Sequence, residues 1–152
     1  MAIPTLEEVA REAKTVILAE GALSFFGQRI SFAQAGWFEE GQVRQPNLVI
    51  APGNKSPQPR GSRLTTVRDE IVTLVFYAYQ TKFGTEKGLF GDTNFKGITE
   101  IGDALQDFLL TNKLNDLAIP DWLGTEYPQW YARNFELLGE VRVTMNYRIR
   151  GT

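Results

Sequence analysis

The chain has 152 residues, a formal net charge of −2, and neither cysteine nor histidine. This length is typical of one domain, and we expect a single domain over residues 1–152. The missing residue types exclude disulfides and Ser/His/Asp or Cys/His catalysis, and they remove the commonest zinc ligands. The slight acidic excess argues against a dedicated nucleic-acid-binding protein, which needs a basic surface. No basic segment precedes an apolar one at the N-terminus, so we expect neither a signal peptide nor a membrane span.

The N-terminal part predicts one helix and two short strands. Thr5 and Glu8 fit a capping box, and the apolar residues that follow at spacings of three and four predict an amphipathic helix over residues 6–20. Residues 30–33 and 47–51 are expected to be strands. The stripe of the helix is suited to cover one face of a sheet.

Two segments of this half are candidates for contact with a partner. Trp37 and Phe38 lie beside two acids and between two glycines, which indicates a loop. This aromatic pair either folds over the edge of the core or contacts a partner. Residues 52–63 hold three prolines, and their charges are all basic. We expect a mobile basic loop at about 52–65, which either has no role or becomes ordered on a partner. Its basic residues are Lys55, Arg60 and Arg63.

Two further stretches predict the central and the last strand. Residues 67–79 are rich in β-branched and aromatic side chains and are apolar on both faces, so we expect a strand in the middle of a sheet with each face covered. The C-terminal stretch alternates between apolar and polar residues, which is typical of a strand with one buried face. Its apolar side carries Val141, Val143, Met145, Tyr147 and Ile149.

Arg142, Arg148 and Arg150 lie on the polar side of this last strand. They are either solvated or contact a neighbouring subunit or another protein, for which the planar guanidinium is well suited.

A glycine-rich stretch over residues 82–97 predicts a long turn before a second helix at 100–112, with Thr99 as its N-cap. The glycines lack the Gly-Lys-Ser/Thr ending of a P-loop. A partial match to a calcium loop begins at Asp92, but Lys96 stands where an oxygen ligand is needed, so we expect no metal or other cofactor. Together, the elements predict an α+β fold with a mostly antiparallel sheet of about four to five strands and two main helices packed on it.

An aromatic cluster follows the second helix. Trp122 and Trp130 lie close in sequence to Asp121 and Glu126, a combination found in carbohydrate-binding and glycoside-hydrolysing sites. Packing in the core or at a subunit interface explains the same aromatic residues.

The order of these elements resembles the tail terminator (tail completion) proteins of tailed bacteriophages and their neck relatives. The resemblance is carried by the capped helix, the strand PNLVIAPG, the basic loop, the central strand, the helix GITEIGDALQDFL and the closing strand GEVRVTMNYRIR. It covers nearly the whole chain, and it is a resemblance of pattern without an invariant motif.

The resemblance implies a structural virion protein that is not an enzyme. Such proteins form a ring, usually of six copies, that caps the tail tube, ends its polymerisation and provides a surface for head joining. The implied partners are further copies of the chain, a tail tube protein and a head–tail connector or neck protein, with no membrane and with DNA at most passing through the ring. The implied location is the tail or neck of the virion, after assembly in the host cytoplasm. The alternative is a small carbohydrate-binding or hydrolase domain.

Overall fold

The computed structural model describes residues 4–32, 46–59, 68–81, 86–128, 131–133 and 136–149. Its elements, in chain order, are α1 (Leu6–Ala19), the 3₁₀ helix η1 (Gly21–Phe26), β1 (Ile30–Phe32), β2 (Asn47–Pro59), β3 (Arg68–Thr81), α2 (Glu86–Phe90), α3 (Ile98–Thr111), β4 (Ile119–Glu126), β5 (Tyr131–Arg133) and β6 (Glu136–Ile149).

Within these described residues, the strands form one six-stranded sheet. Five of them follow the order β1-β2-β3-β6-β4, and the short β5 pairs with β6. The β1–β2 pair is parallel and the other pairs are antiparallel. The predicted α+β class and the mostly antiparallel sheet are therefore confirmed. β3 is the third strand of the path, so the predicted central position of residues 67–79 is also confirmed.

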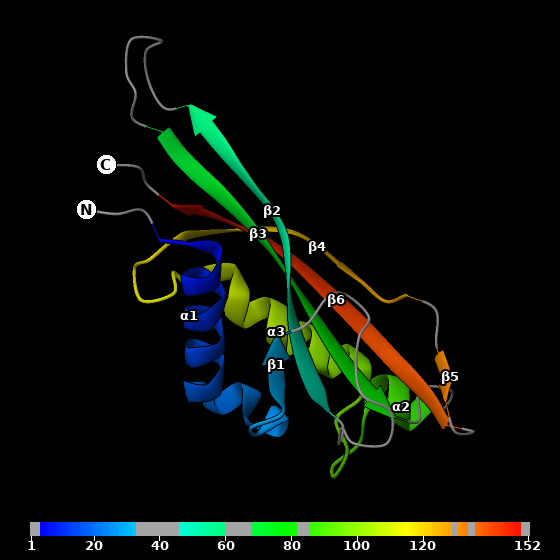
Figure 1. The fold of residues 1–152 in the computed structure, drawn as a ribbon. Coiled ribbons are helices and arrows are strands. Elements are labelled where there is room, and N and C mark those ends of the chain that lie inside the picture. The colour runs from blue at the N-terminus through cyan, green and yellow to red at the C-terminus, as the bar shows by residue number, and fades with distance from the viewer. Residues whose placement is uncertain are drawn as a thin grey trace.

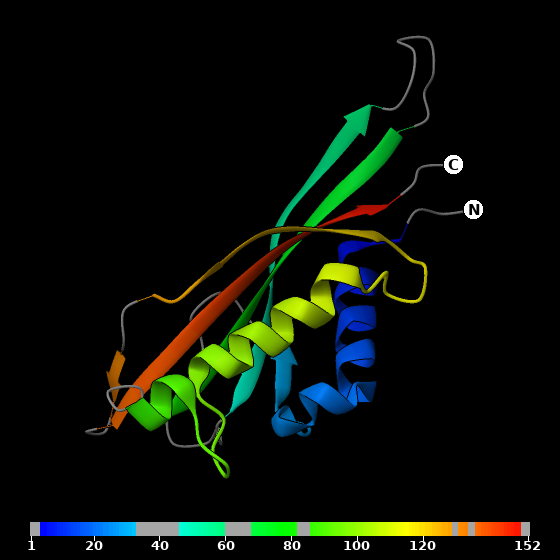
Figure 2. The ribbon, with the colours of Figure 1, turned by 180° about the vertical axis from the view of Figure 1, so that it is seen from behind.

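Both long helices, α1 and α3, pack on the same face of this sheet (Figures 1 and 2). Alternate residues of β3, from Val72 to Ala78, point to that face and are fully buried. β6 contributes the predicted apolar row, every member of which is at most 2% exposed. Ile101 and Leu105 of α3 fill the space above the strands. The main core thus lies between one sheet face and the two helices.

The opposite sheet face, which we call the open face, carries no helix in the part of the chain that the structure describes. The prediction that a layer covers each face of the central strand is confirmed for the helix side, and the described residues do not test it for the open face. Val49, Ala51, Tyr77 and Tyr79 form a small buried cluster there, but Val75 is only half-buried.

β2 is longer than predicted and includes the first part of the basic segment. It continues through Pro59 and pairs with β3 as far as Arg68, so the prediction of an irregular loop is wrong for residues 52–59. Residues 60–65 lie outside the described part of the chain. Among the described residues β1 pairs only with positions 48–50, so in that part of the chain the outer side of β2 is a sheet edge beyond position 50. Proline is tolerated at such an edge, where no ladder hydrogen bond is lost.

The helix boundaries follow from their caps. The capping box of α1 is confirmed, with Glu8 N donating to Thr5 Oγ1 and Thr5 N donating to Glu8 Oε2, both at 3.1 Å. α1 ends at Ala19, and η1 follows it. The predicted turn at 82–97 contains the short helix α2.

The predicted N-cap Thr99 is wrong, because α3 begins at Ile98 with Gly97 as N-cap. A Cβ on Gly97 would lie 2.3 Å from the backbone nitrogen of Gly91, so this contact requires glycine. The Thr99 hydroxyl donates instead to the carbonyl of Leu89 at 2.7 Å.

Candidate functional site

The open face presents three cross-strand rows of side chains from β3, β6 and β4. Ile71, Arg148 and Ile119 form the first row. Thr73, Asn146 and Asp121 form the second, in which the threonine hydroxyl donates to Asn146 Oδ1 at 2.6 Å. Val75 and Thr144 belong to the third. The face combines apolar and polar groups, as protein interfaces do.

A shallow depression of about 260 Å³ lies at the first two rows, and Arg148 is on its wall. Its lining also includes Ile119, which is 45% exposed, and Asp121. Arg148 is exposed, and among the described residues no carboxylate forms an ion pair with it. This guanidinium can therefore pair with a carboxylate of another molecule, which is what a contact with a neighbouring subunit or another protein requires.

Arg142 shares this face of β6 but has a partner within the chain. Its Nε lies 2.9 Å from Oε1 of Glu140, whose side chain is fully buried. The guanidinium also lies over the ring of Tyr77, 5.3 Å from its centroid. Arg142 thus compensates a buried charge, so an intrachain role now competes with the predicted contact role.

The remaining predicted contact residues are only partly placed. Lys55 lies on β2, and its Nζ is 3.2 Å from Oε2 of Glu70 on β3. This ion pair ties the two strands together across the edge of the sheet. Five residues lie outside the described part of the chain: Trp37, Phe38, Arg60, Arg63 and Arg150.

The hydrolase alternative needs two carboxylates that flank one bond. Asp121 pairs with Asn146 and Glu126 with Arg142, so their partners are four positions apart on β6. That separation corresponds to about 14 Å along the strand. Glycosidase carboxylates are about 5–9.5 Å apart, so this geometry disfavours an acid pair. Trp122 pairs with Met145 and therefore lies on the other face of β4, while Trp130 is outside the described residues.

The partial calcium-loop match forms a turn closed by its own side chains. Asp92 Oδ1 accepts a hydrogen bond from Asn94 N at 2.8 Å, and Asp92 Oδ2 is 3.4 Å from Lys87 Nζ. The backbone N–H of Asn94 and the charge of Lys87 lower the pKa of Asp92. No group of three or more potential metal ligands occurs among the described residues.

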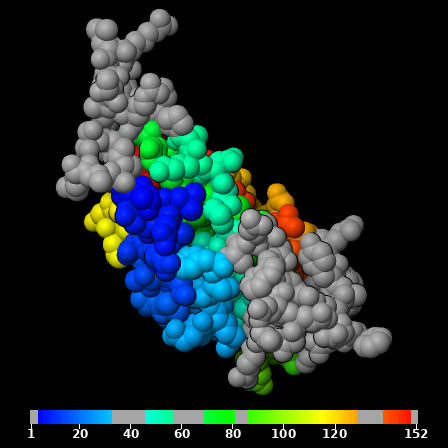
Figure 3. Space-filling model, viewed as in Figure 1, coloured from blue at the N-terminus to red at the C-terminus, as the bar shows by residue number. Residues whose placement is uncertain are grey.

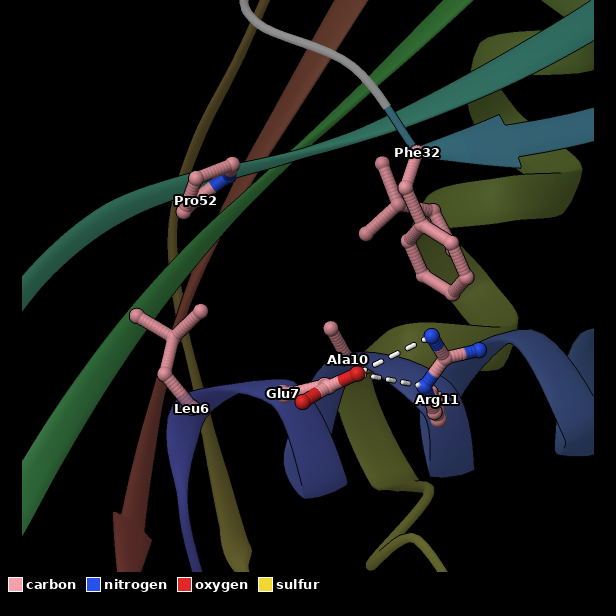
Figure 4. Close-up of a pocket in the computed structure, with 7 residues that line it drawn as sticks. Leu6, Glu7, Ala10, Arg11, Phe32 and Pro52 are labelled. Atoms are coloured by element: carbon pink, nitrogen blue, oxygen red, sulfur yellow. Dashed lines mark hydrogen bonds and ion pairs between the residues drawn. The ribbon is translucent and has the colours of Figure 1, made fainter.

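A second surface, which the sequence did not indicate, is an apolar groove of about 250 Å³ between α1 and the edge of the sheet (Figure 4). We call it the α1–β1 groove, and its lining includes Leu6, Ala10, Ile50, Pro52 and Phe32. Leu6 and Ala10 belong to the predicted helix stripe. What the sequence could not reveal is that β1 has only three residues, so that among the described residues no strand covers this end of the stripe.

No helix in the described part of the chain is long and apolar enough to cross a membrane. The geometry thus offers two contact surfaces, the open face and the α1–β1 groove, and no convergent group of catalytic side chains among the described residues. A comparison with models of protein families finds no match to the chain, and a comparison with curated proteins finds no significant relative.

Proposed function

We propose that the chain is a structural virion protein of the tail terminator type, which is not an enzyme and acts through a ring of copies. The ring, expected to be a hexamer, would cap the tail tube, end its polymerisation and present a surface for head joining. Its partners would be further copies of the chain, a tail tube protein and a connector or neck protein. The protein would be located in the tail or neck of the virion after assembly in the host cytoplasm.

The observation that carries the proposal furthest is the open face with Arg148. The face is mixed in polarity and free of a helix among the described residues, and Arg148 has no carboxylate partner there. Such a surface is suited to contact with a neighbouring subunit or a tail tube protein. The order of elements and the α+β sheet with two helices agree with the resemblance that first suggested this class.

Arg148→Glu tests the contact role. Arg148 is exposed, so the subunit should keep its melting temperature within a few degrees, whereas ring formation or attachment to tails should weaken. Light scattering and a tail-joining assay measure the two effects. Lys113→Glu, a charge reversal at another exposed residue, is the matched control. Wild-type behaviour of Arg148→Glu in both assays would remove Arg148 from the interface.

Negative-stain images of the purified protein test the ring itself. Closed rings of a fixed number support the proposal. A monomer that hydrolyses or binds oligosaccharides would favour the alternative, which the positions of Asp121 and Glu126 disfavour.

A further inference from the structure

The edge strand β4 and Tyr127, the residue that follows it, expose a group of large apolar side chains. Trp122, Leu123 and Tyr127 are 40%, 53% and 42% exposed. Single exposed apolar residues are ordinary, but several along one sheet edge indicate a contact surface. We call these three residues the β4 knob.

Within the knob, the indole of Trp122 is anchored by hydrogen bonds before any contact. Trp122 Nε1 donates to Thr125 Oγ1 at 3.0 Å, and this hydroxyl donates to Gln106 Oε1 on α3 at 2.8 Å. The register shifts between Trp122 and Gly124, so Leu123 has no partner on β6. A bulge of this kind redirects a side chain and hinders the addition of another strand. The knob is therefore suited to insertion of side chains into a partner, at a low cost in conformational entropy.

The α1–β1 groove lies on the opposite side of the molecule from the knob. Figure 1 is seen from the side of α1, β1 and β2, and the view from behind in Figure 2 brings α3 and β4 to the front. On the groove side, α1, β1 and part of β2 form one continuous surface (Figure 3). The groove belongs to one outer edge of the sheet path and β4 to the other.

The volume and the apolar lining of the groove suit it to accept side chains of the knob. Its volume of about 250 Å³ is below the range of about 300–1,000 Å³ for small-molecule sites, so it has room for a few side chains. Apolar side chains dominate its lining, and the Glu7–Arg11 ion pair lies at its rim (Figure 4). Phe32 is 37% exposed beside it. Burial of Leu123 and part of Trp122 would remove apolar surface from water on both partners.

The charges beside the two surfaces are also complementary. Lys14 Nζ lies over the ring of Phe32, 5.3 Å from its centroid, and no acid among the described residues pairs with it. On the knob side, Asp103 of α3 is exposed and follows Gly102, which lies against Tyr127, and Asp103 has no ion-pair partner in the described part of the chain. A lysine beside the groove can therefore meet an aspartate beside the knob, which orients the approach of the two surfaces.

We infer that the β4 knob of one copy inserts into the α1–β1 groove of the next copy. This inference rests on the proposed ring and names the surfaces that build it. The two surfaces differ and lie on opposite sides of the chain, so the contact is heterologous, and repetition of it gives a ring if the rotation closes.

Cysteine cross-linking tests the contact directly, because the native chain has no cysteine. A chain that carries both Pro52→Cys and Leu123→Cys should give a ladder of covalent oligomers with a short bis-maleimide reagent. Each single-cysteine chain should stay uncross-linked, because a heterologous contact never brings two copies of one position together. Arg11→Cys with Leu123→Cys is a second pair, for the case in which the Pro52 variant does not fold. Dimers of Leu123→Cys alone would indicate a two-fold contact instead and overturn the inference.

Two matched sets of variants complete the test by light scattering. Leu123→Asp should reduce association at least tenfold, whereas Phe90→Asp, at a residue that is 60% exposed on α2, should leave it unchanged. Lys14→Glu and Asp103→Lys should each weaken association, and their combination should restore part of it. A wild-type chain that stays monomeric at high concentration would overturn the ring and this contact together. A ring that is indifferent to Leu123→Asp and forms no cross-linked ladder would overturn the contact alone.

Discussion

Replacement of Arg142 with Met is expected to lower the free energy of unfolding by about 3 kcal/mol. Glu140 is fully buried, its ion-pair partner Arg142 is 33% exposed, and the atoms Nε and Oε1 are 2.9 Å apart. Oε2 of Glu140 accepts no hydrogen bond from the described residues. Removal of one partner of a buried pair costs about 3–5 kcal/mol, because the other charge stays buried without compensation. Water reaches Arg142, so we expect the lower end of that range.

Urea unfolding followed by circular dichroism measures this loss. A thermal melt is the second measurement. For a chain of this size, each kcal/mol lost from the free energy of unfolding lowers the melting temperature by about 2–4 °C, so it should fall by roughly 6–12 °C. Measurements at several protein concentrations separate the effect from a change in association. Arg148→Met is the matched control, and it should remain within about 0.5 kcal/mol of wild type because Arg148 is exposed.

The double variant Arg142→Met with Glu140→Met separates the pair from its packing. Replacement of both charges by apolar groups of similar size is often neutral or stabilising, so most of the loss should be recovered. If Arg142→Met unfolds like the wild type, the pair has no structural role, and the assignment of Arg142 to an intermolecular contact regains its weight.

Three further predictions concern the core. Tyr147→Phe should raise the free energy of unfolding by about 1 kcal/mol, because its buried hydroxyl has no hydrogen-bond partner among the described residues. Burial also raises the pKa of Tyr147, so wild-type stability should fall as the pH rises above about 10, and Tyr147→Phe should reduce that loss in pH-dependent melts. Leu74→Asp, at a fully buried residue on the helix side, should abolish cooperative melting by circular dichroism, whereas Val75→Asp, half-buried on the open face, should still fold. Gly102→Ala should lower the melting temperature, because its Cβ would lie 2.5 Å from Oη of Tyr127, and addition of Tyr127→Phe should recover part of the loss.

The elements that were predicted correctly are those whose signals are local. The capping box of Thr5 and Glu8 involves contacts within a single helical turn. The alternation of β6 predicted which side chains are buried, because successive strand residues point to opposite faces. The composition of β3 indicated its central place in the sheet.

The errors occur where tertiary pairing decides the outcome. Composition alone indicates an irregular chain at 52–59, but pairing with β3 supplies the hydrogen bonds of an edge strand that tolerates proline. Thr99 is a good N-cap by residue type, but the approach of Gly97 to the backbone of Gly91 sets the start of α3 two residues earlier. In both cases a contact with another element overrides the local preference.

The arginines of β6 show a signal that was present in the sequence and was not used. Residues two apart on a strand share a face, so Glu140 lies next to Arg142 on the open face, whereas Asn146 is the neighbour two residues before Arg148. The residue two positions earlier therefore distinguishes Arg142, which has an acidic neighbour, from Arg148, which does not. Whether such a pair is buried depends on the fold, which places the side chain of Glu140 out of contact with solvent.

The two edges of the sheet differ for reasons that can be traced to element lengths. β1 has three residues and pairs with positions 48–50, so within the described ranges Pro52 and the first turn of α1 have no neighbouring strand, and a groove lies between them. At the other edge, β4 has eight residues, and its bulge directs Leu123 outward. Two similar edges would favour a two-fold pair, whereas one concave and one protruding edge favour head-to-tail contacts. If the β4 knob and the α1–β1 groove contact each other as we propose, the short β1 and the bulged β4 are the features that make this contact head-to-tail.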